Sequence, residues 1–81
     1  MDFEKQLRTF ILENYLFTDD DSALNNSDSF LESGIIDSTG ILEVITFIQD
    51  ELNLTVEDDE MIPENLDSVD NILAYVAKKT A

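Results

Sequence analysis

The chain has 81 residues, with 19 acidic and four basic side chains, a formal net charge of −15, no cysteine and no histidine. The missing cysteines exclude disulfides, thiolate metal sites and cysteine nucleophiles, and the missing histidines remove the commonest general base. The acidity argues against binding to nucleic acid and against docking on an anionic membrane surface. We expect one folded domain over residues 1–81.

The acidity has two interpretations that both remain open. The first is that the acidic side chains provide solubility or adaptation to salt. The second is that they dock the protein to basic patches on partner enzymes. No stretch approaches the roughly 18 consecutive apolar residues of a membrane span. The first residues also lack the basic region and apolar core of a signal peptide. We therefore expect a cytoplasmic monomer without a membrane span.

The first predicted element is a helix over residues 2–16. Apolar side chains recur there at spacings of three and four, which is typical of one helix face. They are Phe3, Leu7, Phe10, Ile11 and Tyr15. Asp2 stands at the start, where an acidic side chain complements the helix dipole. We interpret the aromatic residues as core rather than as a ligand cage.

Residues 17–37 break this pattern and predict a long loop rich in turn and cap formers. A calcium loop beginning at Asp19 or at Asp21 would not place oxygen ligands, glycine and glutamate as an EF-hand needs them, so we expect no metal site. Gly34 is expected to supply a positive φ at a turn. Four apolar residues are expected to hold the second half of the loop on the core: Phe30, Leu31, Ile35 and Ile36.

A second helix is predicted over residues 38–52, with Ser38 at its first position. At about 100° per residue, one apolar stripe collects Ile41, Val44, Ile45, Ile48 and Leu52. Leu42 falls outside the stripe, on the side of Ser38 and Thr39. It is therefore either a partner contact or a peripheral core residue.

Residues 53–62 predict a short connection followed by one short helix. Leu54 and Val56 are expected to be buried, and acidic residues 57–60 suit the first turn of a helix. Pro63 is expected to stop that helix, because proline cannot continue it.

A last helix is predicted from about residue 69, with Asp67 or Ser68 as its cap. Its apolar stripe is Val69, Ile72, Leu73 and Val76, and Lys78 and Lys79 lie at its C-terminal end. No strand is predicted. The fold class is therefore all-α, a small antiparallel bundle of three main helices and one short helix.

Ser38 is the candidate functional residue. Backbone N–H groups at a helix start lack intrahelical partners and favour an anion. A serine nucleophile needs a base within hydrogen-bond reach, and the chain offers no histidine and no lysine adjacent in sequence. We therefore expect no enzyme activity and no catalytic residue, and we interpret Ser38 as a site of modification. A thiol on an attached arm would supply the reactive group that a cysteine-free chain lacks.

The residues around Ser38 also resemble a known family. Phe30-Leu31-Glu32-Ser33-Gly34-Ile35-Ile36 precedes Asp37-Ser38, and an apolar-periodic helix follows. This segment resembles the phosphopantetheine attachment site of acyl carrier proteins. An Asp-Ser pair alone is a weak motif, but the helix order, the size and the acidity extend the resemblance over nearly the whole chain.

The resemblance implies a four-helix acyl carrier bundle and a covalent 4′-phosphopantetheine on Ser38. A phosphopantetheinyl transferase would move this arm from coenzyme A, and the thiol of the arm would hold acyl or aminoacyl groups as thioesters. An acyl- or aminoacyl-loading ligase and downstream synthase or transferase enzymes would be the further partners. Asp37 would belong to the recognised motif. The positions that match the helix face read by partners are Thr39, Leu42, Glu43 and Thr46.

Two residues depart from the pattern of fatty-acid carriers, which usually have leucine directly after the serine. This chain has Thr39 and Gly40, which is similar to discrete carriers of D-alanine or of specialised pathways. Fatty-acid, polyketide, nonribosomal-peptide and D-alanyl pathways therefore all stay open. Gly40 costs a helix up to about 1 kcal/mol relative to alanine. It either permits close approach of a partner or of the arm, or has no function.

Two other functions remain as alternatives to a stand-alone carrier that enzymes serve in trans. One is an unmodified acidic helical adaptor that binds basic partner surfaces. The other is a divalent-cation buffer that uses the loop carboxylates.

Overall fold

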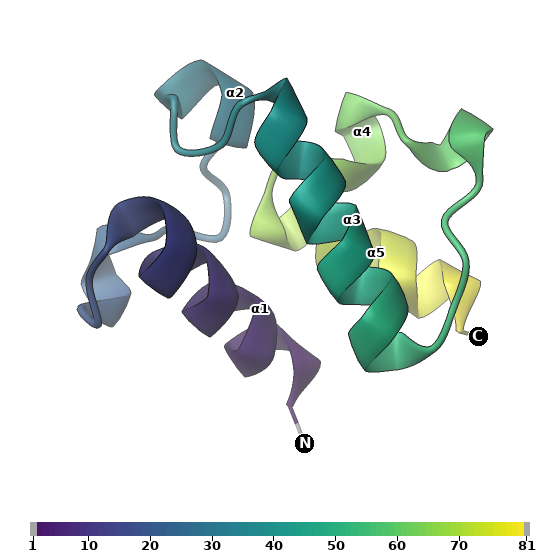
Figure 1. The fold of residues 1–81 in the computed structure, drawn as a ribbon, viewed down its shortest axis with the longest axis horizontal. Helices are drawn as coiled ribbons and strands as arrows, with labels where there is room; N and C mark the ends of the chain where they lie inside the picture. The colour runs from purple at the N-terminus through teal and green to yellow at the C-terminus, as the bar shows by residue number, and fades with distance from the viewer. Residues whose placement is uncertain (1, 81) are drawn as a thin grey trace.

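The computed structural model describes residues 2–80, and within them the chain is all-α without a strand, as predicted (Figure 1). The α-helices are α1 (Phe3–Ile11), α2 (Phe30–Ser33), α3 (Ser38–Leu52), α4 (Pro63–Leu66) and α5 (Val69–Lys79). Shorter helical turns lie at Leu12–Leu16, Asp21–Ala23 and Asp58–Glu60. The prediction of three main helices and one short helix is thus wrong in number, because two separate four-residue helices accompany the three long ones.

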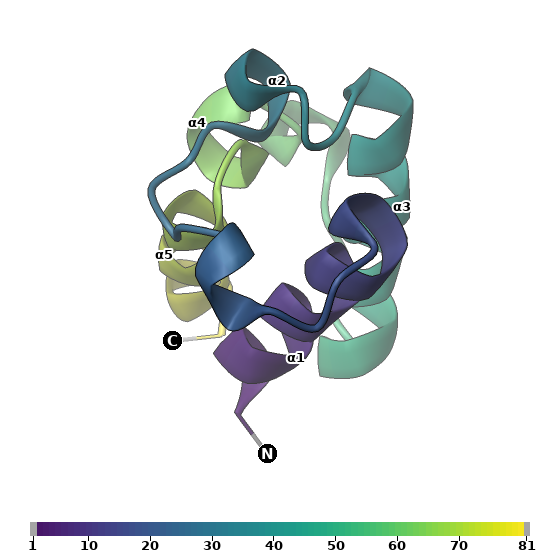
Figure 2. The same ribbon diagram turned by 90° about the vertical axis from the view of Figure 1, so that its left-hand side faces the viewer.

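One hydrophobic core lies between the three long helices, which Figures 1 and 2 show from two sides. Its buried members from these helices are Leu7, Ile11, Val44, Ile45, Ile48, Val69, Ile72, Tyr75 and Val76. Both views place the start of α3 at the same end of the molecule as α2 and α4. None of the helices in residues 2–80 is long and apolar enough to cross a membrane.

The first helix begins where the sequence predicts but ends in an unusual turn. The side chain of Asp2 accepts a hydrogen bond from the Glu4 amide at 3.1 Å and caps α1. After α1, residues Leu12–Leu16 form a π-helical turn, and Phe17 then takes a left-handed conformation with φ 54°. The aromatic residues of the stripe pack against the core as expected; Phe10 stacks on Phe47 of α3, with ring centroids 4.4 Å apart.

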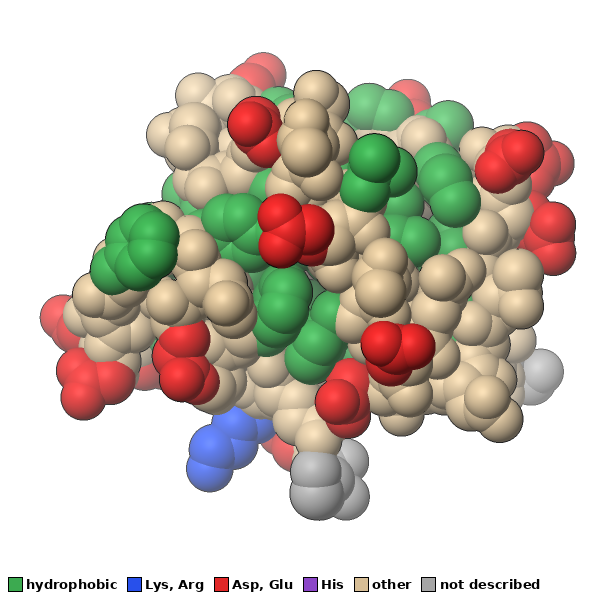
Figure 3. Space-filling view, in the orientation of Figure 1, with side chains coloured by type: hydrophobic (Ala, Val, Ile, Leu, Met, Phe, Trp, Pro, Cys, Tyr) green, Lys and Arg blue, Asp and Glu red, His purple; other side chains and the backbone are tan. Residues whose placement is uncertain are grey.

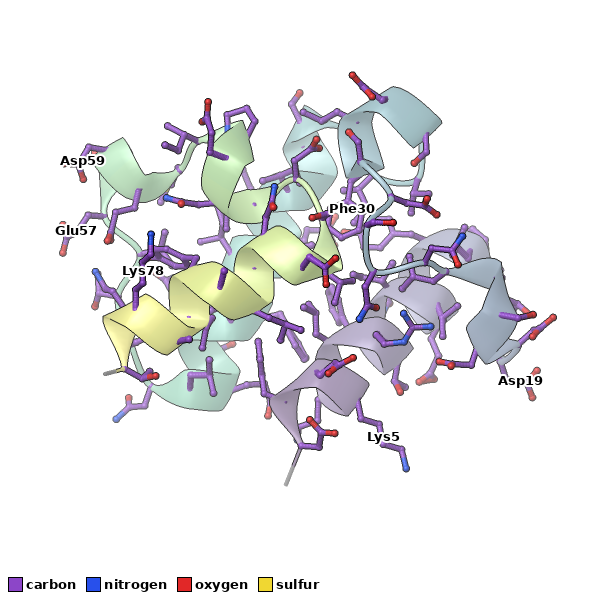
Figure 4. The ribbon with its side chains drawn as sticks, turned by 180° about the vertical axis from the view of Figure 1, so that it is seen from behind. Lys5, Asp19, Phe30, Glu57, Asp59 and Lys78 are labelled. Atoms are coloured by element: carbon purple, nitrogen blue, oxygen red, sulfur yellow. The ribbon has the colours of Figure 1, made fainter. Side chains whose placement is uncertain are left out.

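The predicted long loop is partly helical, which corrects the expectation for residues 17–37. Ser29 caps α2 by accepting a hydrogen bond from the Glu32 amide at 3.1 Å. Phe30 is fully buried and points into the interior (Figure 4), and Gly34 has the predicted positive φ of 76°. Leu31 is 45% exposed, so the prediction that it holds the loop on the core is wrong. In a short helix, adjacent side chains diverge by about 100°, so burying Phe30 turns its neighbour outward.

Arg8 of α1 holds the acidic segment that follows the first helix. Its guanidinium donates to the carboxylate of Asp21 at 2.9 and 3.1 Å, to the Asp21 carbonyl at 2.7 Å and to the Leu24 carbonyl at 2.8 Å. It also donates to the side chain of Asn26. The Asp70 amide of α5 donates to the Asn26 carbonyl at 3.0 Å, so this segment joins α1 to α5.

The segment before the last helix differs from the prediction at Pro63. The short helical turn covers Asp58–Glu60, and Pro63 is the first residue of α4 rather than a stop. Proline suits this position because the first helical N–H has no intrahelical partner. Ser68, and not Asp67, caps α5 by accepting a hydrogen bond from the Asn71 amide at 3.0 Å.

The buried face of α5 also differs in part. Val69, Ile72 and Val76 are buried as predicted, whereas Leu73 is only partly buried. Tyr75, which the predicted stripe omitted, is buried, and its hydroxyl donates to the Glu60 carboxylate at 3.0 Å. Of the two residues in the preceding connection, Val56 is buried and Leu54 only partly.

Candidate functional site

The site is built at the start of α3, where Asp37 precedes Ser38. Asp37 has extended backbone angles, and its Oδ1 accepts a hydrogen bond from the Gly40 amide at 2.7 Å. Its carbonyl accepts the first intrahelical bond, from the Ile41 amide at 3.0 Å. Asp37 is therefore the N-cap, which satisfies one of the free donors of the helix start. Ser38 is the first helical residue, and it is exposed.

Two residues of the segment before Asp37, Gly34 and Ile36, position this helix start. Ile36 is 1% exposed, and its amide donates to the Phe30 carbonyl at 3.3 Å. Gly34 makes the left-handed turn that brings the chain from α2 towards α3. Because Ile36 is anchored in the core, the neighbouring Asp37-Ser38 pair is held at the surface in a defined place.

Gly40 is explained by packing within the chain, which neither earlier interpretation included. A Cβ atom on this residue would lie 2.6 Å from Cγ2 of Ile36 and 3.1 Å from Cε1 of Tyr15. A side chain at 2.6 Å would force one of the two groups to move, and a contact at 3.1 Å is tighter than most real Cβ contacts. Glycine thus lets the first turn of α3 approach both residues.

Tyr15 contacts the same turn from the end of the first helical segment. Its hydroxyl donates to the Gly40 carbonyl at 3.3 Å. Burial raises the pKa of this hydroxyl, and so do the charge and hydrogen bonding of Glu43 and the charge of Asp37. The phenol is therefore protonated at neutral pH and remains a hydrogen-bond donor.

The four predicted face residues, Thr39, Leu42, Glu43 and Thr46, are all exposed. Leu42 is 57% exposed, so it is a surface residue and not a member of the peripheral core. The hydroxyl of Thr46 donates to the Leu42 carbonyl at 3.1 Å, one helical turn back. The structure thus places these four residues on the solvent side of α3, after Ser38.

An apolar groove of about 220 Å³ opens beside Ser38, between α3 and the segment that leads into α4. Ser38 itself lines it, together with apolar residues that include Leu31, Ile41, Leu42, Ile45, Met61 and Ile62. Figure 3 shows hydrophobic surface gathered between α3 and α4, with acidic side chains on either side. Exposed apolar groups next to a charged surface are typical of sites that bind a ligand or a partner.

Sequence reasoning missed Leu31, Met61 and Ile62 as members of this site. Met61 and Ile62 stand between a short turn and Pro63, where no apolar periodicity assigns them to a buried face. Both are exposed. One sequence signal could have identified them. An apolar pair that stands next to a proline and outside any periodic helix is not assigned to the core, and it is therefore a candidate for an exposed site.

The site therefore combines an exposed hydroxyl, a capped helix start and an apolar groove within an acidic surface. Such an arrangement can accept a covalent group on Ser38 and hold an apolar group beside it. In residues 2–80, no three acidic side chains converge so as to hold a metal ion. No protein-family model matches the chain, and no curated protein matches it.

Proposed function

We propose that this protein is a stand-alone carrier of the acyl carrier type, with 4′-phosphopantetheine attached to Ser38. The observation that carries the proposal is the exposed hydroxyl of Ser38 at the first position of α3, directly after the Asp37 cap and beside an apolar groove. The helices of the chain would form the acyl carrier bundle, with α1, α3 and α5 as its long members. The protein would act in the cytoplasm and would have no catalytic activity of its own.

The attachment reaction is a phosphoryl transfer from coenzyme A. Oγ of Ser38 attacks the phosphorus that bears the pantetheine group, and the new Oγ–P bond replaces the P–O bond to adenosine 3′,5′-bisphosphate. That nucleotide leaves, and the hydroxyl proton passes to a base of the transferase, which also supplies Mg²⁺. The N–H groups of Ser38 and Thr39 lack partners within the helix, so the helix start favours the negative charge of the phosphodiester.

The surface around Ser38 supports recognition by partner enzymes. Thr39, Leu42, Glu43 and Thr46 follow it along the exposed side of α3, and Leu31, Met61 and Ile62 add exposed apolar groups at its other edge. A net charge of −15 favours fast association with basic enzyme surfaces, such as a transferase, a loading ligase or a downstream synthase. The cargo would be an acyl or aminoacyl thioester of a fatty-acid, polyketide, nonribosomal-peptide or D-alanyl pathway.

Intact mass spectrometry tests the proposal directly. The purified protein is incubated with coenzyme A, Mg²⁺ and a broad-specificity phosphopantetheinyl transferase. We expect the wild-type mass to increase by one phosphopantetheine group, and we expect no increase for Ser38→Ala. Ser33→Ala is the matched control, because Ser33 is also an exposed serine close to the motif. Modification of Ser38→Ala, or an unmodified but folded wild type, contradicts the proposal.

An unmodified acidic adaptor that binds basic partner surfaces is the second candidate function. The exposed apolar residues beside Ser38 favour this function as much as they favour the carrier. The mass measurement separates the two functions, because an adaptor would remain unmodified with every transferase. A cation buffer would instead bind calcium stoichiometrically in a titration, with or without Ser38.

A further inference from the structure

A second residue controls the helix start that carries Ser38. We propose that Tyr15 is a positioning residue that holds the first turn of α3 and thereby orients the hydroxyl of Ser38 for transfer of the arm. This inference rests on the proposed carrier function. It assigns a role to a side chain that sequence analysis placed only in the core stripe.

Tyr15 and Asp37 both form hydrogen bonds with the backbone of Gly40 in α3, one with its carbonyl and the other with its amide. The Gly40 amide donates to Oδ1 of Asp37 at 2.7 Å, and the Gly40 carbonyl accepts from the hydroxyl of Tyr15 at 3.3 Å. Cε1 of Tyr15 also lies 3.1 Å from the place that a Cβ atom of Gly40 would take. The ring is thus packed on the backbone two residues after Ser38, where the absence of a side chain at residue 40 makes room for it.

The end of the first helix is shaped in a way that brings Tyr15 to this place. Residues Leu12–Leu16 form a π-helical turn, which changes the direction of the side chains relative to a continued α-helix. The ring of Phe10 packs edge-to-face against the ring of Tyr15, with ring centroids 6.1 Å apart.

The phenol also lies close to both carboxylates of the proposed recognition surface. In addition to burial, the charges of Glu43 and Asp37 both raise the pKa of its hydroxyl. Tyr15 therefore joins the backbone of Gly40, in the turn that Asp37 caps, to the end of the first helical segment. Losing the hydroxyl removes this connection, and we expect the turn to become looser.

A loosened turn would affect the chemical step more than docking. Transfer requires Oγ of Ser38 to meet the phosphorus of coenzyme A in a defined geometry, and small misplacements lower the rate of such steps. The exposed apolar residues that dock a transferase stay in place when only the hydroxyl of Tyr15 is lost. The expected signature is thus a lower kcat with an unchanged KM for the carrier.

The chain provides a matched control in Tyr75. It is also a tyrosine packed in the core that donates a hydrogen bond, to Glu60 at 3.0 Å, and burial together with Glu60 raises the pKa of its hydroxyl. It lies on α5 and has no part in the turn of Ser38. Tyr75→Phe therefore removes the same atom at a site remote from the motif.

The experiment measures steady-state transfer of phosphopantetheine from coenzyme A by a broad-specificity transferase. We expect Tyr15→Phe to lower kcat by about three- to tenfold, the effect of one lost hydrogen bond, with KM for the carrier unchanged. Tyr75→Phe should leave both constants at wild-type values. Leu42→Ala should show the opposite split, a raised KM with an unchanged kcat, because Leu42 docks the enzyme.

Amide hydrogen exchange supplies a second readout at the turn itself. The amides of Gly40 and Ile41 both donate to Asp37, and we expect them to exchange faster in Tyr15→Phe than in Tyr75→Phe.

The outcomes separate this inference from the carrier function. A wild type that takes up no arm refutes the carrier function, and the role of Tyr15 fails with it. A modified wild type with a wild-type kcat for Tyr15→Phe refutes the role of Tyr15 alone. Equal losses in the two tyrosine variants also refute it, because the loss would then reflect general stability.

Discussion

The carboxylate of Asp37 accepts a hydrogen bond from the amide of Gly40 across 2.7 Å and so closes the first turn of α3. This bond gives Asp37 a structural role next to the proposed modification site. The side chain that precedes Ser38 in the motif also holds the helix that presents Ser38. Substitutions at Asp37 would therefore change stability as well as recognition by a transferase.

The capping role predicts a measurable loss of stability in Asp37→Ala. Losing an N-cap aspartate costs about 0.5–2 kcal/mol. Urea unfolding followed by circular dichroism would measure the change in the free energy of unfolding. Asp19→Ala is the control, because Asp19 projects into solvent (Figure 4) and its loss changes the net charge equally. Equal stability of the two variants would show that the cap contributes nothing.

Gly40→Ala is predicted to destabilise the protein, against the ordinary preference of a helix. Alanine is favoured over glycine in a helix by about 1 kcal/mol. Here the new Cβ would lie 2.6 Å from Cγ2 of Ile36, and overpacking of this kind typically costs about 1–3 kcal/mol. Thermal unfolding would compare it with Thr39→Ala, which changes an exposed residue of the same turn. A higher melting temperature for Gly40→Ala than for wild type would contradict the packing described here.

The ion pair between Glu60 and Lys79 predicts a stability term that depends on pH. Nζ of Lys79 lies 2.6 Å from Oε1 of Glu60, and this hydrogen bond is the main cause that lowers the pKa of Glu60 and raises the pKa of Lys79. The folded protein holds the Glu60 proton less tightly than the unfolded chain. Stability therefore rises with pH between the lowered pKa of the folded state and the ordinary glutamate pKa of the unfolded state. The contribution of Glu60 to stability is fully present above the ordinary glutamate pKa of about 4.3, and it is lost as the pH falls through the lowered pKa of the folded protein.

Lys79 contributes with the opposite sign of pH dependence. Its pKa is raised, so its contribution is present below the ordinary lysine pKa of about 10.4 and is lost as the pH rises through the raised value.

Melting temperatures of wild type and Glu60→Gln should differ at about pH 7 and converge in strong acid. Glu51→Gln, at an exposed glutamate, should show no such convergence. A constant difference between wild type and Glu60→Gln at all pH values would refute the role of the pair.

The net charge predicts that salt stabilises the fold. The Debye length is about 30 Å at 0.01 M salt and about 8 Å at 0.15 M. The molecule measures 31 × 28 × 19 Å, so at low salt its carboxylates repel one another across the whole domain. We expect the melting temperature to rise by at least about 4 °C over this range, corresponding to about 1 kcal/mol. Mg²⁺ should act in the same direction.

A charge-reduced variant tests the cause of the salt effect. Asp19→Asn, Asp50→Asn and Glu51→Gln combined neutralise three exposed carboxylates. This variant should melt higher than wild type at low salt and should respond less to added salt, because less repulsion remains to be screened. An unchanged melting temperature of the wild type from low to moderate salt would contradict the prediction.

Periodicity and capping rules predicted the parts of the fold that depend on neighbours in the chain. The helix over residues 38–52 was predicted with the bounds that α3 has, because its apolar stripe and its Asp-Ser start are both local signals. The positive φ of Gly34 follows from the same kind of rule, and so does a cap of α5 at Asp67 or Ser68, of which the structure selects Ser68. The helical wheel separated Leu42 from the stripe and left it as a partner contact or a peripheral core residue, and its exposure excludes the second.

The missed features depend on contacts between distant segments. The α2 helix is stabilised by Asp67: its carbonyl accepts from the Phe30 amide at 2.7 Å, and its carboxylate accepts from the Leu31 amide at 3.1 Å. A four-residue helix is too short to form by its own propensity, so the local cap signals of Ser29 and Gly34 at its two ends do not suffice without these contacts. The hydroxyl of the buried Tyr75 likewise finds its acceptor in Glu60, which lies 15 residues away in the chain.

By itself, the sequence determined an acidic all-α chain with a serine at the start of its central helix, because composition, periodicity and capping are local properties. Only the tertiary structure decided what surrounds that serine. The apolar groove joins Leu31 of α2 and Met61 before α4 to the first turn of α3, and Tyr15 reaches that turn from the end of the first helical segment. Such neighbours are set by how helices pack, and packing follows the shapes of side chains that lie far apart in the sequence.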